Sequence, residues 1–170
     1  MLVATVLAAA SAVAQEPKDL RDTRRQFESL KHPTEADRVR YVAHLVRLRE
    51  TFRRADAEIM GRIDAEIIRH PMPATADSGL LSRRLVGRWQ SPRRPYFYHA
   101  DGTWAANDDT AVDTGGTWRI ERNQFFQNFR SETPGSGETI ILLTDTDFVY
   151  GSGPTPYYLR RGTAFPWRDS

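Results

Sequence analysis

The sequence predicts an α+β protein, with an N-terminal helical hairpin followed by a small antiparallel up-and-down β-barrel or curled sheet of about eight short strands. Two patterns carry this prediction. The first half repeats apolar residues every three or four positions, as one face of a helix does. The second half repeats a glycine followed two positions later by a tryptophan, at Gly87-Arg88-Trp89, Gly102-Thr103-Trp104 and Gly116-Thr117-Trp118. In an extended chain these two positions share one face.

Composition limits the classes of function that the chain can perform. Its 170 residues include no cysteine, which excludes disulfides, thiolate metal sites and a cysteine nucleophile. Hydrophobic residues make up 39% and charged residues 27%, values typical of a globular protein. The net charge of +2 argues against nucleic acid as a partner. We expect no cofactor and no resident metal.

Residues 1–14 have the pattern of a signal peptide. An apolar run from Leu2 to Ala10 precedes the small residues Ala12 and Ala14, which suit signal peptidase and leave Gln15 as the new N-terminus. The run is too short to span a membrane, and it lacks a preceding basic residue. A buried N-terminal helix is the alternative. We predict a periplasmic or secreted protein with no stable membrane anchor after cleavage.

Residues 15–70 are predicted to form the helical hairpin. The first helix spans 16–31 and ends before Pro33, and Thr34 can cap the second. The second is predicted as one helix of about 35 residues. Its apolar stripe consists of Tyr41, Leu45, Leu48, Phe52, Ala55, Ile59, Ile63 and Ile67. The stripe either packs on the β unit, which we favour, or forms a homodimer through residues 41–67. His44 and His70 are expected to be solvated.

Residues 71–79 read as a linker, and Asp77 or Ser78 is expected to cap a short helical turn over 79–84. The β unit spans 80–161, and 162–170 form a C-terminal tail. The candidate strands are Leu85–Gln90, Tyr96–His99, Thr103–Ala106, Gly116–Glu121, Gln124–Phe129, Thr139–Thr144, Phe148–Gly151 and Tyr157–Arg161. Short strands separated by turn residues predict a sandwich or barrel.

Alternation within the strands predicts which side chains face inward. Trp118 and Ile120 share one face, which we assign to the core. Phe97 is expected to be in the core as well, so Tyr96 and Tyr98 would face out. They would either receive the stripe of the long helix, which we favour, or form an exposed aromatic surface for a carbohydrate or protein.

The order of these motifs resembles the lipocalin-like (calycin) group of small meander barrels. The resemblance covers residues 80–161 and rests on the helical turn, the Gly-x-Trp that opens the first strand, and the arginines of the last strand. It implies that Trp89 stacks on Arg160 or Arg161 and closes the barrel. The chain departs from lipocalins in its short strands, its lack of a disulfide, its lack of a helix after the barrel, and its preceding hairpin. With strands this short, we expect side chains such as Trp104, Trp118, Phe97, Phe125 and Leu142 to fill the interior.

Several residues have side chains suited to chemistry, but their sequence context favours a structural role. His99 and Asp101 form a His-x-Asp pair, but Asp101-Gly102 is also an ordinary hairpin turn. Asn107, Asp108, Asp109 and Asp113 lie in an acidic loop that lacks the central glycine and closing glutamate of an EF-hand. Serines between glycines at 135–137 and 151–153 match no catalytic or phosphate-binding motif. No catalytic residue is therefore assigned.

Three functions remain open from the sequence. The favoured one is an exported non-enzymatic protein that binds a small apolar ligand or an envelope partner. The candidate contact residues are Trp104, Tyr96, Tyr98, Arg93 and Arg94, and the structural ones that close the barrel or fill its core are Trp89, Arg160, Arg161 and Trp118. The alternatives are a structural dimer through the long helix and a metal-assisted envelope hydrolase that uses His99, Asp101, Asp108 and Asp109.

Overall fold

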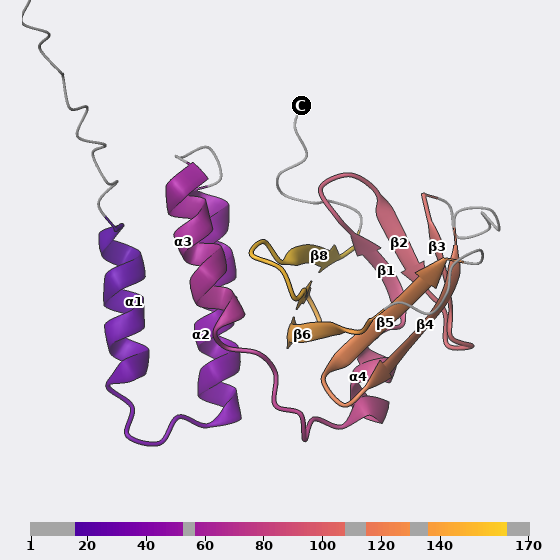
Figure 1. The fold of residues 1–170 in the computed structure, drawn as a ribbon, viewed down its shortest axis with the longest axis horizontal. Helices are drawn as coiled ribbons and strands as arrows, with labels where there is room; N and C mark the ends of the chain where they lie inside the picture. The colour runs from indigo at the N-terminus through magenta and orange to yellow at the C-terminus, as the bar shows by residue number, and fades with distance from the viewer. Residues whose placement is uncertain (1–15, 53–56, 108–114, 130–135, 163–170) are drawn as a thin grey trace, which may run out of the picture.

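The computed structural model describes residues 16–52, 57–107, 115–129 and 136–162, and it confirms the α+β class. Helices precede a closed barrel in which each strand pairs antiparallel with the next and the last pairs with the first (Figure 1). The helices are α1 Lys18–Glu28, α2 Glu35–Thr51, α3 Ala57–Ile68 and α4 Ser78–Leu85. The strands are β1 Gly87–Gln90, β2 Pro95–Tyr98, β3 Thr103–Ala106, β4 Gly116–Glu121, β5 Gln124–Phe129, β6 Glu138–Leu143, β7 Asp147–Tyr150 and β8 Tyr157–Arg161.

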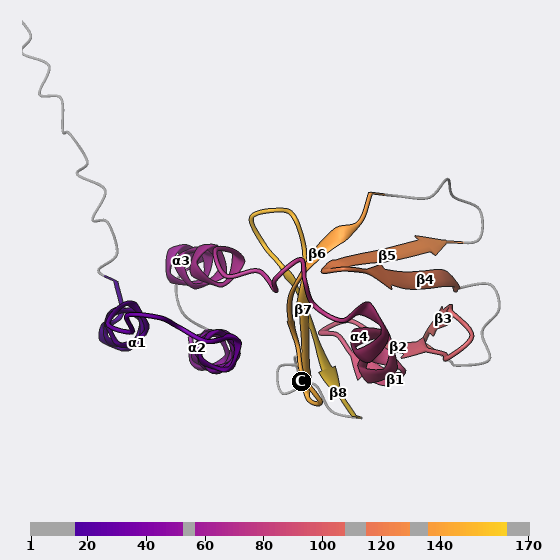
Figure 2. The ribbon, with the colours of Figure 1, turned by 90° about the horizontal axis from the view of Figure 1, so that it is seen from below.

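The prediction of one long second helix is wrong. The segment forms two helices, α2 and α3, which lie side by side (Figures 1 and 2). Folding back lets the apolar stripe cover itself, since Leu45, Ile63 and Ile67 are fully buried in one cluster. Because the chain itself buries these residues, the stripe presents no apolar dimer face at these positions. The predicted start of α2 is confirmed by a capping box between Thr34 and Asp37.

The helices pack on the barrel at a different place from the one expected. The helical cluster is completed by side chains on the outer face of β6, β7 and β8, namely Ile141, Leu142, Val149 and Tyr158. Figure 2 shows α2 and α3 beside this part of the barrel, with α1 outermost. Tyr96 and Tyr98 therefore do not receive the stripe.

The faces of β2 are opposite to the prediction. Tyr98 is 1% exposed and belongs to the barrel core, and Tyr96 packs against that core. Phe97 faces outward, where the guanidinium of Arg88 lies 5.8 Å from its ring. A strand alternates with a period of two residues, so the pattern alone fits either phase. The register of Tyr98 opposite Gly87 and Trp104 sets the phase in the folded chain.

The barrel interior is filled by aromatic side chains. Ring contacts run from Trp89 to Phe148 at 5.9 Å, from Phe148 to Phe125 at 5.2 Å, from Phe125 to Tyr98 at 5.8 Å, and from Tyr98 to Trp118 at 5.8 Å. The expected inward position of Trp118 is confirmed, and Ile120 joins it in the core. Side chains therefore fill the barrel interior, as its short strands predict.

The glycines of the repeated motif allow close approach of other groups. Gly87 has φ +124°, a conformation that side chains disfavour, and a Cβ there would lie 2.8 Å from Arg161. At Gly116 a Cβ would lie 1.9 Å from the carbonyl oxygen of Asn128 on β5. These positions exclude larger residues because the barrel closes tightly around them.

Several predictions fall outside the described residues. They are the signal peptide at 1–14, the acidic residues Asp108, Asp109 and Asp113, and the tail from 163 onward. Within the described ranges, no helix has the length and apolar character needed to cross a membrane.

Candidate functional site

The up-and-down order gives the barrel two distinct ends. Because β1 follows α4 directly, odd-numbered strands start at the α4 end and even-numbered strands finish there. Leu81 and Leu85 of α4 pack into the barrel core at that end, and the indole N–H of Trp89 donates to the carbonyl oxygen of Leu85 at 2.6 Å. We call the opposite side the far end; it carries the end of β5 and β7 and the beginning of β2, β6 and β8.

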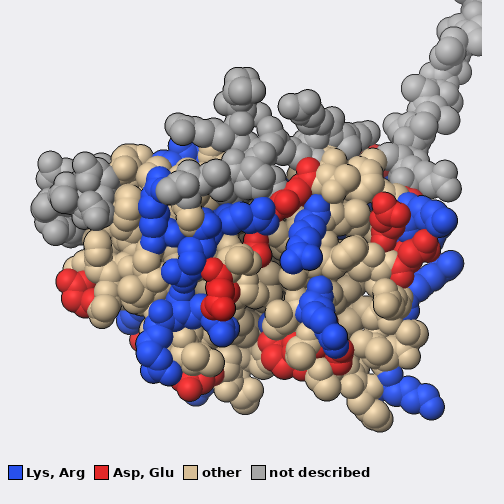
Figure 3. Space-filling model, turned by 180° about the vertical axis from the view of Figure 1, so that it is seen from behind, with Lys and Arg blue, Asp and Glu red and all other residues tan. Residues whose placement is uncertain are grey.

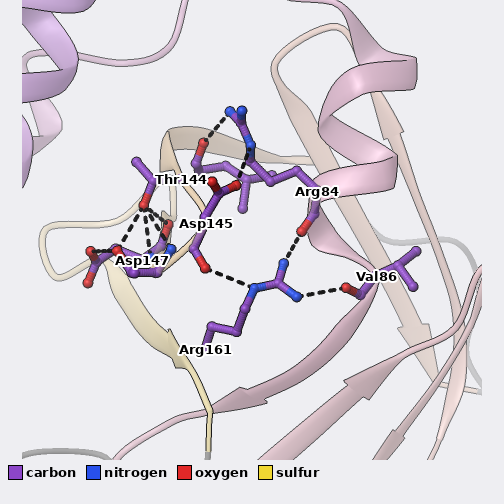
Figure 4. Close-up of polar contacts among 8 residues, drawn as sticks. Arg84, Val86, Thr144, Asp145, Asp147 and Arg161 are labelled. Atoms are coloured by element: carbon purple, nitrogen blue, oxygen red, sulfur yellow. Dashed lines mark hydrogen bonds and ion pairs between the residues drawn. The ribbon is translucent and has the colours of Figure 1, made fainter.

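Arg161 closes the α4 end (Figure 4). Its Nε donates to the carbonyl oxygen of Asp145 at 2.9 Å, Nη1 donates to that of Val86 at 3.0 Å, and Nη2 donates to that of Arg84. The guanidinium also lies 4.5 Å from the Trp89 ring. Of the two arginines proposed for this contact, Arg161 makes it.

Arg160 instead links the barrel to the helices. It donates to Asp147 of β7 at 2.9 Å and also pairs with Glu50 of α2. A second link is buried: Arg49 donates to Asp64 at 2.5 Å, and the hydroxyl of Tyr158 donates to the same carboxylate at 2.6 Å. Burial raises the pKa of Tyr158, and the neighbouring Asp64 charge raises it further. These ion pairs fix the helices to β7 and β8.

His70 is not solvated as predicted. Its side chain is 23% exposed, and its ring contacts those of Phe27 and Tyr41 edge-on. Its Nε2 lies 3.2 Å from Glu66, a buried carboxylate that also accepts from Tyr41 and Arg24. Burial opposes ionisation of Glu66, but these hydrogen bonds and charges outweigh burial and lower its pKa. The cluster joins α1, α2 and α3. His44, in contrast, is exposed as expected.

Two grooves lie beside α1, yet they do not have the character of a built site. One of about 410 Å³ and one of about 490 Å³ lie between α1 and α2 and share Thr23, Gln26 and His44. They are open and lined largely by polar and charged side chains at the surface. A hollow of this kind forms where two helices meet at solvent, whereas a binding site is marked by polar groups that converge at a partly buried place.

Tyrosines converge at the far end of the barrel. Tyr150 and Tyr157 stack with ring centroids 5.1 Å apart, and Tyr157 is 59% exposed while Tyr150 is buried. Tyr96 is half-buried on the same inward face as Tyr98, whose hydroxyl donates to Gln127 at 3.4 Å. Burial raises the pKa of Tyr150, and the nearby Tyr96, Tyr157 and Glu138 raise it further. The Tyr150 hydroxyl therefore stays neutral in the physiological range.

Glu138 is the acidic group of this end. It lies opposite Phe125 in the β5–β6 register and two positions before the fully buried Ile140, so its side chain points inward. Its Oε2 atom is buried and has no hydrogen-bond partner. Buried carboxylate oxygens in proteins are nearly always hydrogen-bonded or paired, so this atom is poised for a partner from outside the chain.

The predicted contact residues divide into two groups. Trp104 is 2% exposed, packs on Phe129 and donates its indole N–H to Asn128, so it belongs to the core and is closed to outside partners. Tyr98 is buried in the same way. Tyr96 lies at the far end. Arg93 is exposed beside it, and Arg94 donates to the Tyr96 hydroxyl at 3.2 Å.

The His-x-Asp pair lies at a hairpin turn, as the Asp101-Gly102 sequence predicts. Asp101 accepts from the backbone and side chain of Thr103, and these hydrogen bonds lower its pKa. The carbonyl oxygen of His99 accepts from Trp118. Asp108 and Asp109 lie outside the described residues. In the described part of the chain, no three histidine or acidic side chains gather in a way that suits a metal ion.

Surface charge is mixed on the face seen from behind. Basic side chains cross the barrel and the helices there, with acidic side chains between them (Figure 3). This distribution agrees with a net charge of +2 and with the many ion pairs that the arginines make.

Comparison with known protein families, curated protein sequences and solved structures finds no match to this chain.

Sequence reasoning missed Glu138, Tyr150 and Tyr157. A signal for Glu138 was present, because it lies in phase with Ile140 at the start of an apolar strand. A carboxylate in an inward position is costly and marks a place where function outweighs stability. The two tyrosines join it only when β7 and β8 pair with β6 and β1, which their own sequence does not specify.

Proposed function

We propose that the protein is an exported, non-enzymatic binding protein with a lipocalin-like barrel, and that its contact site is the far end. The closed eight-strand barrel, the helix at one end and the stacking of Arg161 on Trp89 support the lipocalin-like assignment. Export is supported by the pattern of residues 1–14.

The observation that carries the proposal is the contrast between the two ends. The α4 end is plugged by apolar side chains and by Arg161. The far end presents an exposed tyrosine, a half-buried tyrosine and an unpartnered carboxylate oxygen. Because aromatic side chains fill the interior, the occupant contacts this end with one compact group and is not engulfed. That group belongs to a small molecule or to an envelope protein.

The site is tested by aromatic-labelled NMR with a set of small probes of positive, negative and neutral charge. We expect bound probes to shift the ring resonances of Tyr96, Tyr150 and Tyr157, and Tyr157→Ala to weaken binding. Leu80→Ala is the matched control, since it removes an apolar side chain that is 44% exposed on α4. Shifts that map to the α4 end, or an unaltered Tyr157→Ala variant, would contradict the proposed site.

Export is tested separately by expression in a Gram-negative host. We expect a periplasmic species whose mass corresponds to a chain that begins at Gln15. Accumulation of the uncleaved chain in the cytoplasm would remove the exported part of the proposal and leave the binding part intact.

A further inference from the structure

We infer that the far end binds an organic ammonium group, held by the carboxylate of Glu138 and the rings of Tyr150, Tyr157 and Tyr96. This inference rests on the proposed function and names the chemical class of its ligand. It goes beyond the sequence-based expectation of an apolar ligand.

The charge of the ligand follows from Glu138. Glu138 lies opposite Phe125 and near Tyr150; the residue is half-buried, and its buried Oε2 atom has no hydrogen-bond partner. An anionic ligand would be repelled there, and a neutral apolar one would leave the oxygen unpartnered. A ligand that carries a positive charge and N–H or polarised C–H groups complements it.

The surrounding rings favour an organic cation over a metal ion. Cations bind over the faces of aromatic rings. Tyr150, the ring near Glu138, stacks on both Phe148 at 4.6 Å and Tyr157 at 5.1 Å, so the 59% exposed Tyr157 is the ring of this pair that faces an incoming cation. A metal ion needs several oxygen or nitrogen ligands, and no set of three histidine or acidic residues converges in the described chain. One carboxylate near Tyr150, at the end of the barrel that also carries Tyr96 and the exposed Tyr157, therefore matches an alkylammonium group.

Arg94 is the cation already present at this end. Its guanidinium lies 5.3 Å from the Tyr96 ring and donates to the Tyr96 hydroxyl at 3.2 Å. No hydrogen bond joins it to Glu138 Oε2. The Arg94 guanidinium covers the Tyr96 ring, so an incoming ammonium group competes with the guanidinium for contact with Tyr96. Removal of this guanidinium is expected to leave ammonium binding equal or tighter.

The test is an NMR titration of the chain with choline and with 3,3-dimethylbutan-1-ol, which has the same shape without the charge. We expect choline to shift the rings of Tyr150 and Tyr157 and to bind at least about tenfold more tightly than the alcohol. Glu138→Gln keeps the shape of the side chain and should reduce choline affinity at least about tenfold while leaving the alcohol unchanged. Glu121→Gln, an exposed carboxylate at the α4 end, should change neither.

A second measurement separates a binding role of Glu138 from a structural one. Because its Oε2 is unpartnered, Glu138→Gln should melt at the same temperature as the parent or higher. A marked drop in melting temperature would show that the carboxylate has a partner in the fold, and would contradict the inference.

Other outcomes decide between the inference and the proposed function. Any of three results would overturn the ammonium inference. The first is equal affinity for choline and the alcohol, the second is unaltered choline binding by Glu138→Gln, and the third is weaker choline binding by Arg94→Gln. If neutral or anionic probes bind the far end and choline does not, the inference fails and the proposed function stands. If no probe of any charge shifts these rings, both fail.

Discussion

Replacement of Arg161 by leucine should destabilise the barrel substantially, because this side chain closes the end next to α4. It donates hydrogen bonds to three backbone carbonyls, those of Asp145, Val86 and Arg84, and lies over Trp89. Arg161→Leu removes all four interactions and retains only apolar contact with the indole.

The magnitude follows from the contacts. Hydrogen bonds from a charged donor contribute about 1.5 kcal/mol each at the lower end of their range, and the cation–π contact adds about 1 kcal/mol. The carbonyl of Asp145 lies at the surface and regains water, and leucine keeps part of the packing. We therefore expect a loss of about 2–3 kcal/mol in the free energy of unfolding. For a chain of this size that corresponds to a fall of about 5–10 °C in melting temperature.

Urea denaturation and thermal melting of matched variants measure this effect. Arg161→Lys keeps the charge but cannot span three carbonyls, so it should recover about 1 kcal/mol. Arg83→Leu replaces an exposed arginine of α4 and should stay within about 0.5 kcal/mol of the parent. A loss below about 1 kcal/mol for Arg161→Leu, or one equal to that of Arg83→Leu, would refute the closing role.

Three further predictions concern buried charge, pH and backbone space. Asp64→Asn should cost about 2–4 kcal/mol in urea denaturation because it leaves a buried guanidinium unpaired, whereas Tyr158→Phe should cost about 1 kcal/mol; equal losses would contradict this. Hydrogen bonds from the capping threonine lower the pKa of Asp37 to about 2, below its ordinary value, so its contribution is present above about pH 4 and is lost as pH falls through 2. The helical circular dichroism of Asp37→Asn should accordingly change less than the parent's between pH 4 and 2, and parallel curves would exclude this role. Gly61→Ala should stabilise by about 0.5–1 kcal/mol, since a Cβ there meets nothing within 4 Å, whereas Gly116→Ala should cost more than about 2 kcal/mol; similar melting temperatures for both would be inconsistent with the fold.

The strands were predictable because their signals are local. All eight predicted strands are present, and their bounds lie within two residues of those observed. Turn residues such as Asp101-Gly102 and Arg122-Asn123 mark where one strand ends and the next begins. The caps at Thr34 and Asp77 were predictable for the same reason, since each hydroxyl or carboxylate binds backbone groups two or three residues away.

The helical break and the strand phase were not predictable from local pattern. No glycine or proline lies between Thr51 and Ala57, so nothing in the sequence opposed one continuous helix. The chain folds back because two short helices bury the stripe that one long helix would expose.

The sequence by itself therefore determined the class of the fold, the positions of the strands and the aromatic filling of the barrel, because periodicity and turn chemistry act over a few residues. Only the tertiary structure decided which face of β2 points inward, which arginine closes the barrel, and that Glu138, Tyr150 and Tyr157 meet at one end. The physical reason is that alternation fits two phases equally well, and cross-strand register, formed by residues far apart in the chain, selects one of them.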